Sequence, residues 1–153
     1  MRDIKKIILH CSDSRGGDNK LIDAWHKERG FDEIGYHFVI CNGYPNIRNR
    51  DGNYYPKQDG NYHPRLDGLL QPGRSIDKIG AHCLGHNDDS VGICLIGQRL
   101  FSAKQLIETL QDLLVELMCQ FDLEPKDIYG HYELASNKTC PNINMDSIRR
   151  LFI

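Results

Sequence analysis

Two short and almost purely apolar runs place the strongest limit on how this chain can fold. Residues 7–9 read Ile-Ile-Leu, and residues 91–96 read Val-Gly-Ile-Cys-Leu-Ile. A strand with one face in water alternates apolar and polar residues, whereas a continuous apolar run is typical of a strand buried on both faces. We therefore expect 91–96 to be a central strand and 7–9 a second buried strand of one sheet with helices packed on it.

Strand and helix patterns mix along the rest of the chain. The expected elements are a helix over 18–29, a strand over 34–40, a long helix over 102–121, a short strand at 128–129 and a last helix from 144. Gly30 is the expected stop of the first helix. Ser102 and Gln105 have capping-box spacing, and Asn144 is a good N-cap residue. These patterns predict an α/β fold in a single domain.

The composition is that of an ordinary soluble globular protein. The 19 basic and 21 acidic side chains give a net charge of −2, so the chain lacks the basic footprint of a nucleic-acid partner. No apolar run has the length of a signal-peptide core or a membrane span, so we expect cytoplasmic synthesis and no membrane insertion. In a reducing compartment, Cys41, Cys94 and Cys119, which lie within apolar segments, are expected to be core thiols.

Residues 51–74 contain three copies of an eight-residue unit. The copies are 51–58, 59–66 and 67–74, and each begins with Asp-Gly and has Pro at its sixth position. Asp-Gly favours tight turns, and Pro is excluded from central strands. We therefore expect a series of turns that projects from the domain, as a turn-rich insertion at about residues 46–70.

The segment 130–142 carries the residue types of a metal site. His131 and Cys140 lie nine positions apart, and Lys138 stands two positions before the Cys. Neutral imidazole and thiolate are good zinc ligands, and a catalytic zinc usually takes three protein ligands. His10, at the end of the first buried strand, is the best candidate for the third. Seven His and six Cys also produce chance pairs, so an isolated pair would be weak support for a metal.

Several segments, taken together and in order, resemble one enzyme family. They are 8–12 (Ile-Leu-His-Cys-Ser), 25–31 with 34–40, 80–87 (Gly-Ala-His-Cys-Leu-Gly-His-Asn) with 90–97, 130–131 (Gly-His) and 138–141 (Lys-Thr-Cys-Pro). The chain thus resembles the zinc-dependent N-acetylmuramoyl-L-alanine amidases of the phage T7 lysozyme type, which share a fold with the peptidoglycan recognition proteins. The resemblance implies one amidase domain over 1–153, with a central mixed β-sheet flanked by helices and the zinc in a surface groove.

The resemblance also implies a site and a reaction. By position, His10, His131 and Cys140 match the ligands of one Zn²⁺, and Tyr36 and Lys138 match the catalytic side chains beside it. The implied reaction is hydrolysis of the amide bond between N-acetylmuramic acid and L-alanine in peptidoglycan. Zinc lowers the pKa of a bound water to about 7 and polarises the carbonyl. The implied protein is a monomeric, bacteriolytic endolysin of phage or prophage type, which acts on the cell wall after its release.

The resemblance also suggests roles for residues around the groove. The loop at 80–87 lies near the groove in the family, so His82, His86 and Asn87 are candidate substrate contacts. Tyr132, followed by Glu133, stands where many relatives have Arg. The turn array is either a rim over the groove or an inert insertion in a surface loop, and we favour the inert insertion. As a rim, it would contact sugar or peptide through Tyr54, Tyr55, Tyr62 and His63.

Two other functions compete with an amidase. Some relatives with this fold bind muropeptides without cutting them, but such recognition modules typically lose a zinc ligand, most tellingly the Cys, and Cys140 is present here. A structural zinc domain would need a closed site with four ligands, and the spacing offers no neat fourth donor. Both arguments favour the enzyme.

Overall fold

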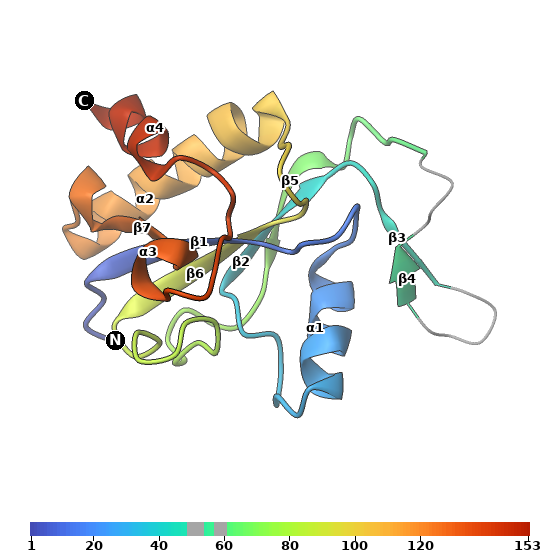
Figure 1. Cartoon of the computed structure of the whole chain (residues 1–153), viewed down its shortest axis with the longest axis horizontal. Coiled ribbons are helices and arrows are strands. Elements are labelled where there is room, and N and C mark those ends of the chain that lie inside the picture. Colours follow the sequence, from blue (N-terminus) through green and yellow to red (C-terminus); the bar gives the residue numbers. More distant parts are fainter. Residues whose placement is uncertain (49–53, 57–60) are drawn as a thin grey trace.

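The computed structural model describes residues 1–48, 54–56 and 61–153. Its main element is a five-stranded sheet with the strand order β5-β2-β6-β1-β7 (Figure 1). The strands are β1 Lys6–Cys11, β2 Phe38–Asn42, β5 Asp67–Pro72, β6 Ser90–Leu95 and β7 Ile128–Gly130. All neighbours pair in parallel except β5, which runs antiparallel to β2. The sheet is therefore mixed, as the resemblance implied.

The apolar run at 91–96 occupies the centre of this sheet. All six residues of β6 are buried, and β6 pairs with β1 on one side and with β2 on the other. In β1, Ile7, Ile8 and Leu9 are completely buried. The prediction of two strands covered on both faces is confirmed.

Helices cover both faces of the sheet (Figure 1). On one face, α1 (Asn19–Glu28) contributes Ile22 to a small core with Val39 and Cys94. On the other face, a long helix begins as the π-helix η1 (Lys104–Leu110) and continues as α2 (Gln111–Phe121), which buries three leucines in the larger core. The remaining helical elements are η2 Pro125–Asp127, α3 His131–Leu134, α4 Met145–Arg149 and η3 Arg150–Phe152.

The predicted caps form. The Asp18 side chain accepts a hydrogen bond from the third residue of α1, and Asn144 caps α4. Ser102 and Gln105 exchange two backbone-to-side-chain hydrogen bonds, both 3.0 Å long. Gln105 is fully buried, and its amide also donates to two backbone carbonyls, at Ile40 and just after β6. The capping box therefore ties the long helix to the two strands beneath it.

The strand predicted over 34–40 is shorter than expected, because β2 begins only at Phe38. The residues before it make other contacts. The Gly35 N–H donates to the ring of His26, and the Gly35 carbonyl accepts from the Ala81 N–H. Residues 34–37 thus connect α1 with the loop after β5.

The repeat prediction is wrong for the third copy. Residues 67–72 form β5, an edge strand of the main sheet, rather than another turn, and Pro72 is its last residue. An edge strand tolerates Pro because one side of the strand has no partner. The described parts of the first copy include β4 (Tyr54–Pro56), which pairs with β3 (Asn46–Arg48) beyond the edge of the main sheet (Figure 1). The projecting part therefore ends before Asp67, and residues 49–53 and 57–60 lie outside the described residues.

All six cysteines are free thiols. Cys41 and Cys94 are buried as expected, but Cys119 is exposed on α2, so its prediction as a core residue is wrong. A helical period leaves some apolar positions on the outer face, and Cys119 occupies one of them. Among the described helices, none combines the length and apolar character that crossing a membrane requires.

Candidate metal centre

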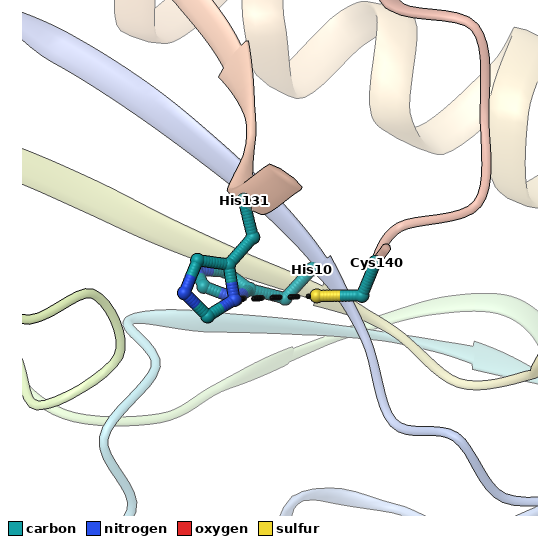
Figure 2. A group of neighbouring side chains, drawn as sticks. All are labelled: His10, His131 and Cys140. Atoms are coloured by element: carbon teal, nitrogen blue, oxygen red, sulfur yellow. Dashed lines mark hydrogen bonds between the residues drawn. The ribbon is translucent and has the colours of Figure 1, made fainter. Parts of the chain in front are cut away.

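The ends of two neighbouring parallel strands bring the predicted ligands together. In the pairing of β1 with β7, Leu9 lies opposite Gly130, so the next residues, His10 and His131, stand side by side. Cys140 reaches them from the loop after α3, where its carbonyl accepts a hydrogen bond from the Tyr132 N–H. Figure 2 shows the three side chains converging from these separate elements.

The geometry of the three ligand atoms fits zinc. Two imidazole nitrogens and one thiol sulfur lie within 4.8 Å of one another. Cys140 Sγ is 3.3 Å from His131 Nδ1 and 3.9 Å from His10 Nδ1. Around a tetrahedral zinc, with Zn–N of about 2.0 Å and Zn–S of about 2.3 Å, nitrogen and sulfur ligands are about 3.6 Å apart. The two measured distances lie on either side of this value, so small shifts would place both nitrogens and the sulfur around one ion.

Both candidate histidine ligands are held in the neutral form that binds metals. Burial lowers the pKa of His10 well below its ordinary value, and the neighbouring His82 adds to this. Burial also lowers the pKa of His131, and the positive charge of Lys138 acts in the same direction. The thiol of Cys11 interacts with Cys140 but is not in the ligand group, as expected from the alternation of side chains along β1.

His131 and Cys140 line a groove of about 1090 Å³, and both predicted catalytic side chains line it as well. The ring of Tyr36 lies 5.0 Å from the ring of His10, centroid to centroid. Burial raises the pKa of Tyr36 well above its ordinary value of 10.0, so the hydroxyl stays a proton donor at neutral pH. Lys138 is exposed, and its charge reaches His131. The groove therefore combines a group that could hold a metal ion with a hydroxyl donor and a cation.

Two of the three residues predicted as substrate contacts, His82 and Asn87, use their side chains in contacts within the protein. His82 and Asn87 line the groove, but His82 Nδ1 lies 2.9 Å from His10 Nε2, on the side of that ring away from Cys140. Asn87 Oδ1 accepts the N–H groups of His82 and Cys83, both at 2.8 Å. The carbonyl of His86 accepts from a serine hydroxyl. Contact of these residues with substrate stays a prediction.

Tyr132 and Glu133, which differ from the expected family pattern, contact the C-terminal helix. The Tyr132 hydroxyl accepts from the Met145 N–H at 3.3 Å. The Glu133 carboxylate accepts from the Gly130 N–H and forms an ion pair with Arg149 at 2.6 Å. Neither residue lines the groove, so this departure changes how α3 is held against α4.

Sequence reasoning missed two residues that line the groove. His26 is buried, lines the groove, and accepts the Gly35 N–H at 2.8 Å. Its position four residues after Ile22, on the inner face of α1, was the available signal. Arg99 also lines the groove, from the loop after β6, and no pattern in the sequence marks it.

Comparison with known proteins supports the resemblance on which these assignments rest. The endolysin of Escherichia phage T7 is 29% identical over an alignment of 150 residues, and the match covers 91% of this chain and 81% of the relative. Among solved structures, the N-acetylmuramoyl-L-alanine amidase LysC from Clostridium intestinale superposes with a TM-score of 0.75 at 22% identity, and the match covers 98% of this chain and 85% of the other. Drosophila PGRP-LB gives a TM-score of 0.65 at 23% identity and 99% and 79% coverage, so it shares the fold. A family model described as N-acetylmuramoyl-L-alanine amidase matches residues 1–143, and this chain therefore belongs to the N-acetylmuramoyl-L-alanine amidase family.

Proposed function

We propose that this chain hydrolyses the amide bond between N-acetylmuramic acid and L-alanine in peptidoglycan, and that His10, His131 and Cys140 hold one zinc ion for this reaction. The observation that carries the proposal is the convergence of two imidazole nitrogens and a sulfur within 4.8 Å. Membership in the amidase family indicates which bond is cleaved. The set of two imidazole nitrogens and one sulfur indicates that the metal is zinc. When bound, zinc provides a water of lowered pKa and a Lewis acid for the amide carbonyl.

The side chains around the ligands have separate roles in this proposal. The groove holds the glycan and its stem peptide so that the lactyl amide lies over the three ligands. The Tyr36 hydroxyl, kept protonated by burial, donates a hydrogen bond toward the reacting water or the carbonyl oxygen. The Lys138 ammonium stabilises the negative charge that develops on that oxygen, an effect worth about 3 kcal/mol for a well-placed donor.

The test is digestion of purified peptidoglycan with zinc-loaded protein, scored by newly exposed L-alanine amino termini. We expect release that a chelator stops and added zinc restores. Cys140→Ser should lose zinc binding and release together, because it removes the thiolate ligand. Cys119→Ser is the matched control, since it removes an exposed thiol on α2 that is not in the ligand group.

Other outcomes would redirect the assignment. Zinc-loaded protein that exposes no L-alanine termini but stays bound to the wall would contradict the amidase and support a muropeptide recognition module. If L-alanine amino termini are still exposed in the presence of the chelator and by the Cys140→Ser variant, the metal site is contradicted but the amidase activity is not.

The place of action and the oligomeric state belong to the same proposal. The endolysin relatives suggest that the protein works on the cell wall after release from the cytoplasm. All three ligands come from one chain, so one copy is sufficient and we expect a monomer. Light scattering of the zinc-loaded protein checks the state. Addition of the protein to intact and permeabilised bacteria checks whether access to the wall limits lysis.

A further inference from the structure

We propose that His82, seated in a slot between two glycines, is a positioning residue that fixes the ring of the ligand His10 and thereby sets the zinc affinity of the site. The inference rests on the proposed zinc site. It assigns a role to a residue for which the sequence suggested only substrate contact.

A directed chain of hydrogen bonds runs behind His10. Since His10 Nδ1 faces Cys140 and serves as the ligand atom, the ring proton is on Nε2, which donates to His82 Nδ1 at 2.9 Å. His82 then carries its own proton on Nε2, which lies 3.3 Å from Ser90 Oγ. The Ser90 hydroxyl donates to the His86 carbonyl at 2.6 Å. Every donor in the chain has an acceptor, so the ligand ring is held in one tautomer and one orientation.

Two glycines make room for the ring of His82. A Cβ added to Gly92, in the middle of β6, would lie 2.6 Å from His82 Cδ2 and 2.8 Å from His82 Nδ1. A Cβ on Gly80 would lie 2.5 Å from His82 Cδ2. Neither glycine has the positive φ that favours glycine for backbone reasons. The space they leave is therefore needed for the imidazole and not for a turn.

The backbone at His82 is fixed as firmly as its ring. The Asn87 side chain accepts the N–H groups of His82 and Cys83, and so holds the start of the loop that carries the imidazole. Ring contacts complete the enclosure, with His10 edge-on at 5.0 Å and His37 at 5.8 Å between centroids. His82 is thus held in one orientation by three independent features. They are the hydrogen-bond chain, the space left by the two glycines, and the hydrogen bonds to the Asn87 side chain.

The experiment measures zinc affinity directly, by competition with a chromophoric chelator. His82→Phe fills the slot but cannot accept from His10, and we expect zinc affinity to fall about 10- to 100-fold. His82→Asn can place its Oδ1 near the position of Nδ1, and we expect it to recover most of that loss. His86→Ala is the matched control, because it keeps the backbone carbonyl that ends the chain and should bind zinc as the unchanged protein does.

A second pair of variants tests the slot. Gly92→Ala should lower zinc affinity at least about 10-fold in the unchanged protein, because the new methyl group displaces the His82 ring. In the His82→Ala background, where the ring is gone, the same Gly92→Ala change should cost less than about 2-fold. This non-additivity distinguishes displacement of the ring from a general weakening of β6.

The outcomes separate this inference from the proposed function. Equal zinc affinity for His82→Phe, His82→Asn and the unchanged protein would overturn the positioning role while leaving the zinc amidase intact. If Gly92→Ala lowers zinc affinity equally in both backgrounds, the claim that Gly92 acts by making room for the His82 ring is overturned. If the unchanged protein binds no zinc, the proposed metal site fails, whatever the His82 variants do. Far-ultraviolet circular dichroism checks that each variant is folded before its affinity is compared.

Discussion

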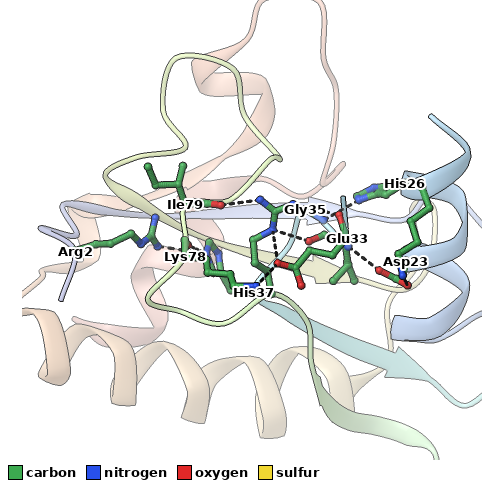
Figure 3. A network of polar contacts seen from close by, with 11 residues as sticks. Arg2, Asp23, His26, Glu33, Gly35, His37, Lys78 and Ile79 are labelled. Carbon is green, nitrogen blue, oxygen red and sulfur yellow. Dashed lines mark hydrogen bonds and ion pairs between the residues drawn. The ribbon is translucent and has the colours of Figure 1, made fainter. Parts of the chain in front are cut away.

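Acid should destabilise this fold through His37. This side chain is 1% exposed, and its Nδ1 accepts the Gly92 N–H at 3.0 Å. Its Nε2 therefore carries the single proton and lies 3.0 Å from the Lys78 carbonyl, with Arg2 beside it at 3.3 Å (Figure 3). Burial, helped by the charge of Arg2, lowers the pKa of His37 from 6.5 to about 4. Protonation would also break the bond from Gly92, because Nδ1 would become a donor.

The size and sign of the effect follow from proton linkage. A lowered pKa means that the folded state prefers neutral His37, so its full stability is present above about pH 6.5 and is lost as the pH falls toward 4. A pKa that differs by one between the folded and unfolded states corresponds to about 1.4 kcal/mol, so the complete loss is about 3 kcal/mol. Between about pH 7 and pH 4.5, the difference in His37 protonation between the folded and unfolded states lowers the free energy of unfolding by about 2.4 kcal/mol.

The assay is urea unfolding of the unchanged protein and of His37→Asn at both pH values. Asn retains an oxygen that can accept from Gly92 but does not titrate. Groups far from His37 affect both proteins alike, so the difference between their pH dependences reports His37 together with its effect on the neighbouring His82. We expect the unchanged protein to lose about 2 kcal/mol more than the variant. Parallel losses, or an NMR titration of His37 with a midpoint near 6.5, would refute the reasoning.

Three further changes test other parts of the structure. Gln105→Leu should lower the free energy of unfolding by about 1–3 kcal/mol in urea titrations, because it removes the side-chain donor of the buried Ile96 carbonyl, while the Ile40 carbonyl still accepts from the Ile96 N–H. Gly35→Ala should destabilise the protein by more than about 3 kcal/mol, measured in the same way, since its Cβ would lie 2.1 Å from the Ala81 carbonyl oxygen. Lys138→Gln should keep zinc, measured by metal analysis, but lower kcat about 100- to 1000-fold.

Local patterns predicted the elements whose environment is uniform along their length. β6 is buried on both faces, so its composition alone indicates a central strand. The long helix over η1 and α2 buries leucines at helical spacing, and the pattern indicates it as well. The start of that helix as a π-helix was not predictable, because the Ser102 capping box is the same for either helix type.

Features that depend on contacts between residues far apart in the sequence were harder to predict from local patterns. β5 resembles the two turn units before it in sequence, and only pairing with β2 makes it a strand. The contact between His10 and His131 depends on the register of β1 against β7. Spacing suggested His10 as a third ligand because it ends a strand, but the register could not be derived from either segment alone. The family resemblance supplied that link.

The histidines show why residue type alone assigns roles poorly in this chain. His26 and His37 each use Nδ1 to accept a backbone N–H, from Gly35 and Gly92 respectively, and each can do so only while neutral. His82 uses the same atom to accept from His10. Burial lowers the pKa of His26 and His37 to about 4 and that of His82 to about 3. The same low pKa that suggests a catalytic residue therefore results here from burial. The neutral rings accept hydrogen bonds that hold the groove wall and one candidate ligand in place, so acid should disturb the site and the fold together.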